Sequence, residues 1–284
     1  QKMLELWSTF PKKIDPVAFQ IGTFKILWYS ISYLLAFFTV YFLLKRKTNN
    51  EPSLSQKVFK NKKPFEVIES FFLYSLAGLF LGAKIGFILF YDFSNFISNP
   101  LGSLSPFSDG LFVGFSGLSF HGGVIGIALA GFWFCKKYSL KFFSVANFIA
   151  LAIPLGYFWG RIGNFLNGEL FGRVTDSPLG MCFLKTGTCV GNKRHPSQLY
   201  EAFGEGILLF FILWFLNKTE LGRKYLFSLW LILYGSIRFM IEFVREPDTH
   251  IGLTALDLTI GQLLCFCMII IGCSIIYFTS GEKQ

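Results

Sequence analysis

Seven apolar runs, each about as long as a membrane-spanning helix, constrain this chain more than any other feature. They cover residues 24–44, 71–91, 118–135, 142–160, 199–216, 225–244 and 258–278. A helix rises about 1.5 Å per residue, so each run can cross a hydrocarbon core of roughly 30 Å. A single segment satisfies its backbone polar groups in lipid only as a helix. We therefore predict an all-α integral membrane protein, with residues 1–284 forming one domain of seven transmembrane helices.

The composition agrees with a membrane protein. The chain is 53% hydrophobic and only 15% charged, which is too apolar for a domain whose surface is wet. Its net charge of +9 bears on membrane orientation and anionic lipid, and we expect no nucleic-acid partner. The first 25 residues mix polar and aromatic types, so we expect no signal peptide among them.

The distribution of Lys and Arg predicts the orientation. The first, third and fifth connecting segments contain thirteen of these residues. The second, the fourth counted from residue 164, and the sixth contain five. The positive-inside rule then places the N-terminus outside and the C-terminus in the cytoplasm, although four lysines before residue 26 argue weakly for the reverse. Residues 164–198, the longest polar segment, would form a cap on the outer, periplasmic side.

Cysteines and glycines add two structural expectations. Cys182 and Cys189 lie in the predicted cap, where a disulfide and a reduced pair are both compatible with the sequence. No spacing typical of a zinc site is present. Glycines four residues apart predict close helix packing, and they are Gly78, Gly82 and Gly86, Gly122 and Gly126, and Gly156 and Gly160.

The stretch Gly160–Arg173 is the most unusual polar segment. It contains two arginines, a glutamate, two asparagines and four glycines, at a point where we predict that a membrane helix ends. Arginine can hold a phosphate through two parallel hydrogen bonds, and glycine lets the backbone approach a ligand closely. A helix end with interfacial arginines explains the stretch almost equally well. The other polar residues of the chain must therefore distinguish a phosphate-binding stretch from an ordinary helix end.

Those residues fall in the outer half of the predicted bundle. Tyr234, Arg238 and Glu242 are spaced i, i+4, i+8 and share one helix face. An internal Arg238–Glu242 ion pair is one explanation. With Arg161 from another helix, the alternative is a pocket for an anion such as a phospholipid headgroup. His121 can exchange a proton near neutral pH, and a packing role for it is equally compatible with the sequence.

Four segments carry a resemblance to a known family: Gly160–Arg173, Phe120–Gly123, Arg194–Glu201 and Tyr234–Asp248. They resemble the phosphatidylglycerol–prolipoprotein diacylglyceryl transferases, bacterial enzymes that open lipoprotein maturation. The resemblance extends from Trp28 and Tyr29 to Gly261 and Gln262.

The resemblance implies transfer of diacylglyceryl from phosphatidylglycerol to the lipobox cysteine thiol of a prolipoprotein. The products would be a thioether-linked lipid and glycerol phosphate. It also implies a bacterial cytoplasmic (inner) membrane location, with the active site toward the periplasm. The partners would be the two substrates and membrane lipids. Neither a metal nor another cofactor is expected.

The resemblance also implies residue roles. Arg161 and Arg238 would contact the phosphate, while Asn164 and Glu169 would hold the headgroup or orient an arginine. His121 would be the base, with Tyr234 as its competitor or partner. The remaining candidates are Tyr29 for substrate binding, Gly163 and Gly172 for the backbone path, and Asn167, Glu201, Glu242 and Arg245 as supporting residues.

Three other functional classes each fit part of this sequence. A transporter for an organic anion needs polar residues through the inner half of the bundle, where this sequence has Phe, Leu, Ile and Ala. An assembly subunit explains the glycine spacing but not the charged residues at one depth. Another phospholipid-headgroup enzyme is excluded only by the motif resemblance.

Overall fold

The chain is predominantly helical in a computed structural model. The structure describes residues 2–22, 24–60, 62–105, 107–108, 111–112, 117–183, 189, 191–246 and 258–280. At residues 24, 107, 108, 111, 112, 120 and 121 it describes the backbone only. The chain divides into two compact units, one comprising Gln1–Leu44 with Ala146–Gln284 and the other Lys45–Val145. The expectation of a single domain stays a prediction.

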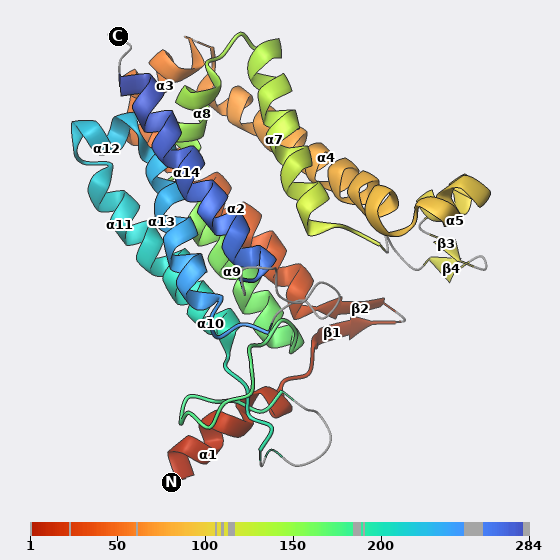
Figure 1. The fold of residues 1–284 in the computed structure, drawn as a ribbon. Coiled ribbons are helices and arrows are strands. Elements are labelled where there is room, and N and C mark those ends of the chain that lie inside the picture. Colours follow the sequence, from red (N-terminus) through yellow and green to blue (C-terminus); the bar gives the residue numbers. More distant parts are fainter. Residues whose placement is uncertain are drawn as a thin grey trace. The chain divides into compact units, whose positions relative to one another are not determined.

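The first unit contains most of the predicted polar site. Its elements are α1 (Lys2–Thr9), the 3₁₀-helix η1 (Phe10–Lys13), β1 (Val17–Ile21), β2 (Phe24–Leu27), most of α2 (Trp28–Asn50), α9 (Ile153–Asn167), α10 (Ser197–Glu201), the π-helix η2 (Ala202–Leu208), α11 (Leu209–Leu216), α12 (Glu220–Lys224), α13 (Leu226–Ile241) and α14 (Ile260–Ser280) (Figure 1).

The second unit is built around two long helices. Its elements are α3 (Pro52–Phe59), α4 (Pro64–Tyr91), α5 (Phe93–Ser98), α6 (Pro100–Leu104), the short hairpin β3 (Phe107–Ser108) and β4 (Leu111–Phe112), and α7 (Phe120–Lys137). Helix α8 (Phe142–Ile149) includes the boundary between the two units.

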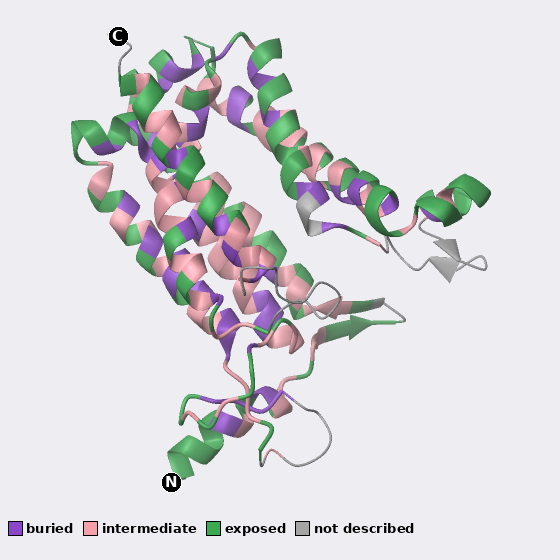
Figure 2. Ribbon diagram, in the orientation of Figure 1, coloured by how far each residue is buried: buried purple, intermediate pink, exposed green. Residues whose placement is uncertain are grey.

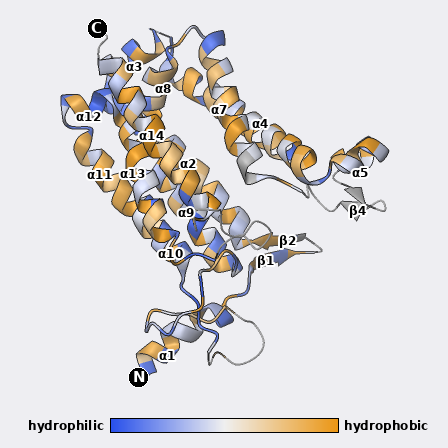
Figure 3. Cartoon of the chain, in the orientation of Figure 1, coloured by the Kyte–Doolittle hydropathy of each residue, from blue (hydrophilic) through white to orange (hydrophobic). Residues whose placement is uncertain are grey.

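Membrane-protein character is evident in both units. Four helical segments are long and apolar enough to cross a membrane: α2, α4, α14 and the continuous segment Ser197–Leu216. The bent pair α8 and α9 gives up to five spans. Large apolar residues such as Leu81, Phe211 and Phe266 are exposed on these helices, as lipid-facing residues are (Figures 2 and 3). The prediction of an α-helical membrane protein is thus confirmed, while the count of seven spans stays a prediction.

The predicted helix over residues 142–160 is wrong in two respects. The structure has two helices, α8 and α9, bent by 57°. Pro154 lies at the start of α9, where its missing N–H and fixed φ suit a first helical turn but not a helix interior. Helix α9 also continues past Gly160 to Asn167 and ends at Gly168, which has a left-handed φ of +69°. The first eight residues of the Gly160–Arg173 stretch are therefore helical.

Three other predicted runs also differ from the structure. Residues 24–27 form the second strand of an antiparallel hairpin with β1 rather than the start of a helix, and α2 begins at Trp28. The run over 199–216 begins at Ser197 and includes the π-helix η2. Helix α4 starts at Pro64, seven residues before the predicted run.

Glycine faces bring α4 and α7 into close contact, as the spacing predicts. A Cβ atom added at Gly82 would lie 2.7 Å from the Cα atom of Gly126, and one added at Gly86 would lie 2.7 Å from that of Gly122. In the first unit, Gly156 faces Val40 of α2 in the same way. Gly160 does not follow this pattern, because a Cβ atom there would meet nothing within 4 Å among the described residues.

The predicted cap, 164–198, begins at the end of α9 and ends in α10, and the described residues between these helices include several that contact the N-terminal helix. The indole nitrogen of Trp7 donates to the carbonyl of Leu179 at 3.1 Å, and the amide of Cys182 donates to the carbonyl of Ser8 at 2.8 Å. Phe165 of α9 lies in an apolar cluster with Met181 and Phe183 of the cap, which joins the cap to the helix.

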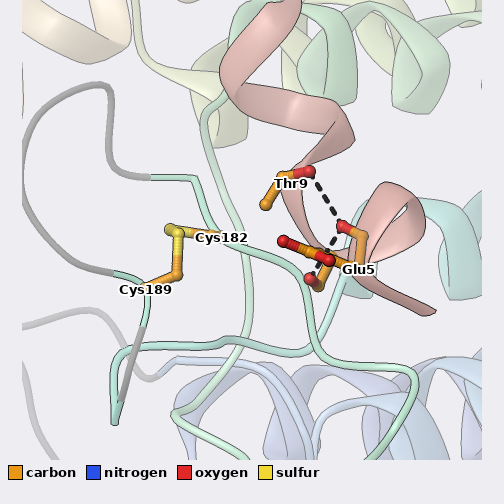
Figure 4. The surroundings of a disulfide bond; sticks show 5 residues. Glu5, Thr9, Cys182 and Cys189 are labelled. Atoms are coloured by element: carbon orange, nitrogen blue, oxygen red, sulfur yellow. Dashed lines mark hydrogen bonds between the residues drawn. A yellow bond between two sulfur atoms is a disulfide. The ribbon is translucent and has the colours of Figure 1, made fainter. Parts of the chain in front are cut away.

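The cap also contains a disulfide between Cys182 and Cys189, with Cα atoms 5.6 Å apart (Figure 4). The sequence left the state of this pair open, and the structure has it bonded. Cys182 lies beside α1, in which the hydroxyl of Thr9 donates to the carbonyl of Glu5 at 2.8 Å.

Candidate anion-binding site

A buried glutamate, Glu201 of α10, contacts three arginines, each from a different segment of the chain. Its Oε2 atom lies 3.0 Å from Nε of Arg161 on α9 and 2.9 Å from Nη1 of Arg238 on α13. Its Oε1 atom accepts a hydrogen bond of 2.6 Å from Arg245, which follows α13. The Glu201 side chain is fully buried, whereas the three arginines remain 13–15% exposed. The carboxylate thus fixes the guanidinium groups from behind and leaves part of each one accessible.

Glu242 forms a second bridge between two of these arginines. It lies 3.2 Å from Arg238, one helical turn earlier, and 3.3 Å from Arg245. The hydroxyl of Thr259 donates to its other oxygen at 3.1 Å. The Arg238–Glu242 pair expected as one alternative is present, and it belongs to a larger network that also includes Arg161.

Asn164 and Glu169 continue the network toward the cap. Arg161 donates to the side-chain oxygen of Asn164 at 3.0 Å, and the Asn164 amide donates to Glu169 at 2.8 Å. The side-chain amide of Gln198 donates to the Glu169 carbonyl at 2.6 Å. The spacing of Arg161 and Asn164 on α9 makes this contact possible, because residues three apart are neighbours on a helix.

Two tyrosines line the same arginines. The hydroxyl of Tyr157 donates to Glu201 at 3.2 Å, and its ring lies under the Arg161 guanidinium, 4.7 Å from the ring centre. Tyr234 packs edge-on against Tyr157 with ring centres 5.7 Å apart. Tyr234 also lies one helical turn before Arg238, as its spacing in the sequence indicates.

Gly172 lies where the cap passes the end of α13. Its amide donates to the carbonyl of His195 at 2.8 Å, and an added Cβ atom would collide with the carbonyl of Val244. Glycine is therefore required by close backbone approach. Partial burial lowers the pKa of neighbouring His195, which favours its neutral imidazole.

The remaining predicted residues are less central. Tyr29 of α2 shares a hydrogen bond of 3.0 Å with Tyr33. Gly163 faces Ser32 and Tyr29. Asn167 ends α9 outside the arginine network. His121 lies in the first turn of α7, in the second unit, and its side chain is outside the described residues.

Two residues of this site, the partly buried Tyr157 and the buried Glu205, were missed by the sequence reasoning. Tyr157 lies one turn before Arg161 on α9, and Glu205 lies one turn after Glu201. The signal for Glu205 was available, because an ionisable residue inside an apolar run is costly and indicates a function by default. Tyr157 carries no such signal, since aromatic residues are common throughout this sequence.

The arrangement suits an anion. Partly exposed guanidinium groups on a rigid buried carboxylate are preorganised donors for phosphate oxygens. Among the residues that the structure describes, no three His, Cys, Asp or Glu side chains converge as metal ligands.

Comparisons with a family model and with individual known proteins identify the same family. A sequence model of the family described as prolipoprotein diacylglyceryl transferase matches residues 16–278. A protein of Chlorobaculum tepidum named phosphatidylglycerol–prolipoprotein diacylglyceryl transferase is 43% identical over 98% of this chain and 94% of its own length. Proteins of the same name from Idiomarina loihiensis and Bordetella bronchiseptica are 42% and 40% identical, over 99% and 94% of this chain and 97% and 96% of theirs.

The family match covers the segments that contribute Arg161, Glu201, Arg238 and Arg245, and the resemblance inferred from the motifs is confirmed. The chain belongs to the prolipoprotein diacylglyceryl transferase family.

Proposed function

We propose that this chain transfers the diacylglyceryl group of phosphatidylglycerol to the lipobox cysteine of a prolipoprotein. The observation that carries the proposal is the convergence of Arg161 and Arg238, from two helices, on the one carboxylate oxygen of Glu201. The accessible faces of these arginines would hold the phosphodiester, and the family match names both substrates of the relatives.

In this reaction the cysteine sulfur forms a bond to the terminal glyceryl carbon of the lipid. The bond between that carbon and the phosphate oxygen breaks, and glycerol phosphate leaves with the electron pair. Negative charge therefore grows on the phosphate, where Arg161 and Arg238 would stabilise it most. Asn164 and Glu169 would keep Arg161 in place through their hydrogen bonds.

The thiol must lose its proton because the thiolate is the nucleophile. We propose His121 as the base on the strength of the family resemblance, with Tyr234 as the alternative. A comparison of His121→Gln with Tyr234→Phe distinguishes them. Loss of the pH dependence of kcat in the first variant but not the second identifies the histidine.

The membrane arrangement is proposed in the same way. We propose seven spans: the four that length and composition support, the bent pair α8 and α9 as a fifth, and α7 and α13. The site would face the periplasm of the bacterial inner membrane. The disulfide in the cap supports this side, because disulfides persist in oxidising compartments such as the periplasm.

The decisive experiment measures glycerol phosphate release and the mass of a lipobox peptide with purified protein and phosphatidylglycerol. We expect Arg161→Lys to lower kcat by about 10²-fold, because lysine cannot make both the Glu201 and Asn164 contacts of the guanidinium. Arg46→Lys, at an exposed position of α2, is the matched control and should leave kcat unchanged. Full activity of Arg161→Lys would contradict the phosphate role.

A further inference from the structure

Glu205 is a second buried glutamate beside the arginines, and the mechanism above does not use it. It lies in the π-helix η2 between α10 and α11, and its side chain is fully buried. Neither carboxylate oxygen has a hydrogen-bond partner among the described residues. Its nearest cationic contact joins Oε1 of Glu205 to Nη1 of Arg238 at 3.7 Å. Glu201, one turn earlier, instead contacts three arginines within 3.0 Å.

The groups that face Glu205 give it little compensation as an anion. The titratable ones are Tyr157 and Arg161 of α9, Glu201 of α10, Tyr234 and Arg238 of α13 and Cys265 of α14. The closest cation, Arg238, already donates from the same nitrogen to Glu201 at 2.9 Å. An ionised carboxylate that is buried without hydrogen bonds is strongly disfavoured.

The net charge of the groups in direct ionic contact depends on this one residue. Among them, three arginines lie within 3.3 Å of two carboxylates, Glu201 and Glu242. An ionised Glu205 would make the cluster neutral, whereas a neutral Glu205 leaves one positive charge. One positive charge matches the single negative charge of a phosphodiester.

We propose that Glu205 is a protonated carboxylic acid in the resting enzyme, and that its proton keeps one uncompensated positive charge on the arginine cluster for the phosphodiester of the lipid. Glu205 is thus a positioning residue that acts through Arg238. The π-helix that carries it fits this role, because such helices frequently occur at functional sites. The phosphodiester part of the inference rests on the proposed function.

The test measures phosphatidylglycerol binding without any peptide, so that no substrate thiol titrates. Infrared difference spectra of the wild type and Glu205→Gln should show the C=O band of a carboxylic acid in the wild type only. At pH 7, Glu205→Gln should bind the lipid nearly as well as the wild type, because glutamine is a neutral isostere. Glu201→Gln should bind the lipid poorly, because the arginines lose the carboxylate that holds them in position.

The pH dependence is a second measurement, and it needs no variant. In the wild type, ionisation of Glu205 as the pH rises should weaken binding by up to about tenfold per pH unit, as the infrared band disappears. Glu205→Gln should lack this step. The proposal is overturned if the wild type has no carboxylic acid band, or if the band is lost at a different pH from lipid binding. It is also overturned if Glu205→Gln loses binding as Glu201→Gln does.

Vesicles of phosphatidylcholine, whose headgroup carries no net charge, serve as the control in the binding measurement. If the transferase assay fails but the infrared band is present and is lost as the pH rises, the proposed function is wrong and the assignment of Glu205 stands. If the transferase is active but Glu205 is ionised at pH 7, the proposed function stands and the assignment of Glu205 is wrong.

Discussion

Glu201 receives three guanidinium groups on two oxygen atoms while its own side chain is fully buried. A buried ion network adds little net stability compared with a well-packed apolar core, but removal of one member leaves uncompensated charges. Glu201 is therefore a structural requirement of the site as much as a support for substrate binding.

We expect Glu201→Gln to destabilise the protein by about 3–5 kcal/mol, because three arginines that are largely shielded from solvent lose their shared anion. The measurement is thermal unfolding in detergent, together with kcat. The matched control is Glu66→Gln, which removes an exposed ion pair with Lys63 and should leave the unfolding temperature unchanged. Equal stability of Glu201→Gln and the wild type would contradict a structural role.

Part of this site could be predicted residue by residue. The spacing of Tyr234, Arg238 and Glu242 gave a shared helix face, and the cost of lipid-exposed charge pointed that face into the bundle. The sequence predicted only in part that Arg161 and Arg238 would contact the same carboxylate of Glu201, because that contact depends on the packing of three helices. No sequence period encodes that packing.

Helices α4 and α7 pack through glycines, and this contact is an element-scale feature. Small residues let two backbones approach within van der Waals distance, which is the main source of attraction between helices in lipid. The spacing of the glycines predicted this face, because it requires only the helical period.

We expect Gly126→Ala to destabilise the protein by about 1–3 kcal/mol, because the added Cβ would collide with the carbonyl of Gly78. Gly131→Ala in the same helix is the matched control, since its Cβ would lie 3.8 Å from two phenylalanine rings. Thermal unfolding of both variants is the measurement. A Gly126→Ala variant as stable as Gly131→Ala would show that this helix pair separates without cost.

The cap disulfide gives a second prediction at this scale. Reduction should destabilise the protein by about 2–4 kcal/mol, because the bond closes the loop from Cys182 to Cys189. The unfolding temperature should fall on addition of a reductant, and a Cys182→Ser, Cys189→Ser variant should start low and not respond. A reductant effect of equal size in that variant would assign the change to other cysteines.

Element boundaries were less predictable than element types. Hydropathy alone merged α8 and α9, although Pro154 is a local signal for a helix start. The β1–β2 hairpin was missed because its residues continue into an apolar helix without a change in composition. The π-helix has no pattern of its own, since one extra residue in a turn leaves the hydrophobic run intact.

At the scale of the whole molecule, orientation is the property that the sequence predicts most directly. We expect cysteines introduced at Asp176 in the cap and at Lys57 in α3, both exposed positions, to lie on opposite sides of the membrane. A membrane-impermeant maleimide should label the first in intact spheroplasts, and the second only after permeabilisation. Labelling in the opposite order would invert the proposed topology.

The sharing of Glu201 by three arginines has an evolutionary consequence. A change at any one of the four positions alters the partners of the other three, so the effects of single substitutions cannot be added. These positions are expected to be epistatic: a substitution that is lethal alone becomes tolerable only when a second one restores the charge balance. The path between two functional versions of this site therefore runs through simultaneous or compensated changes.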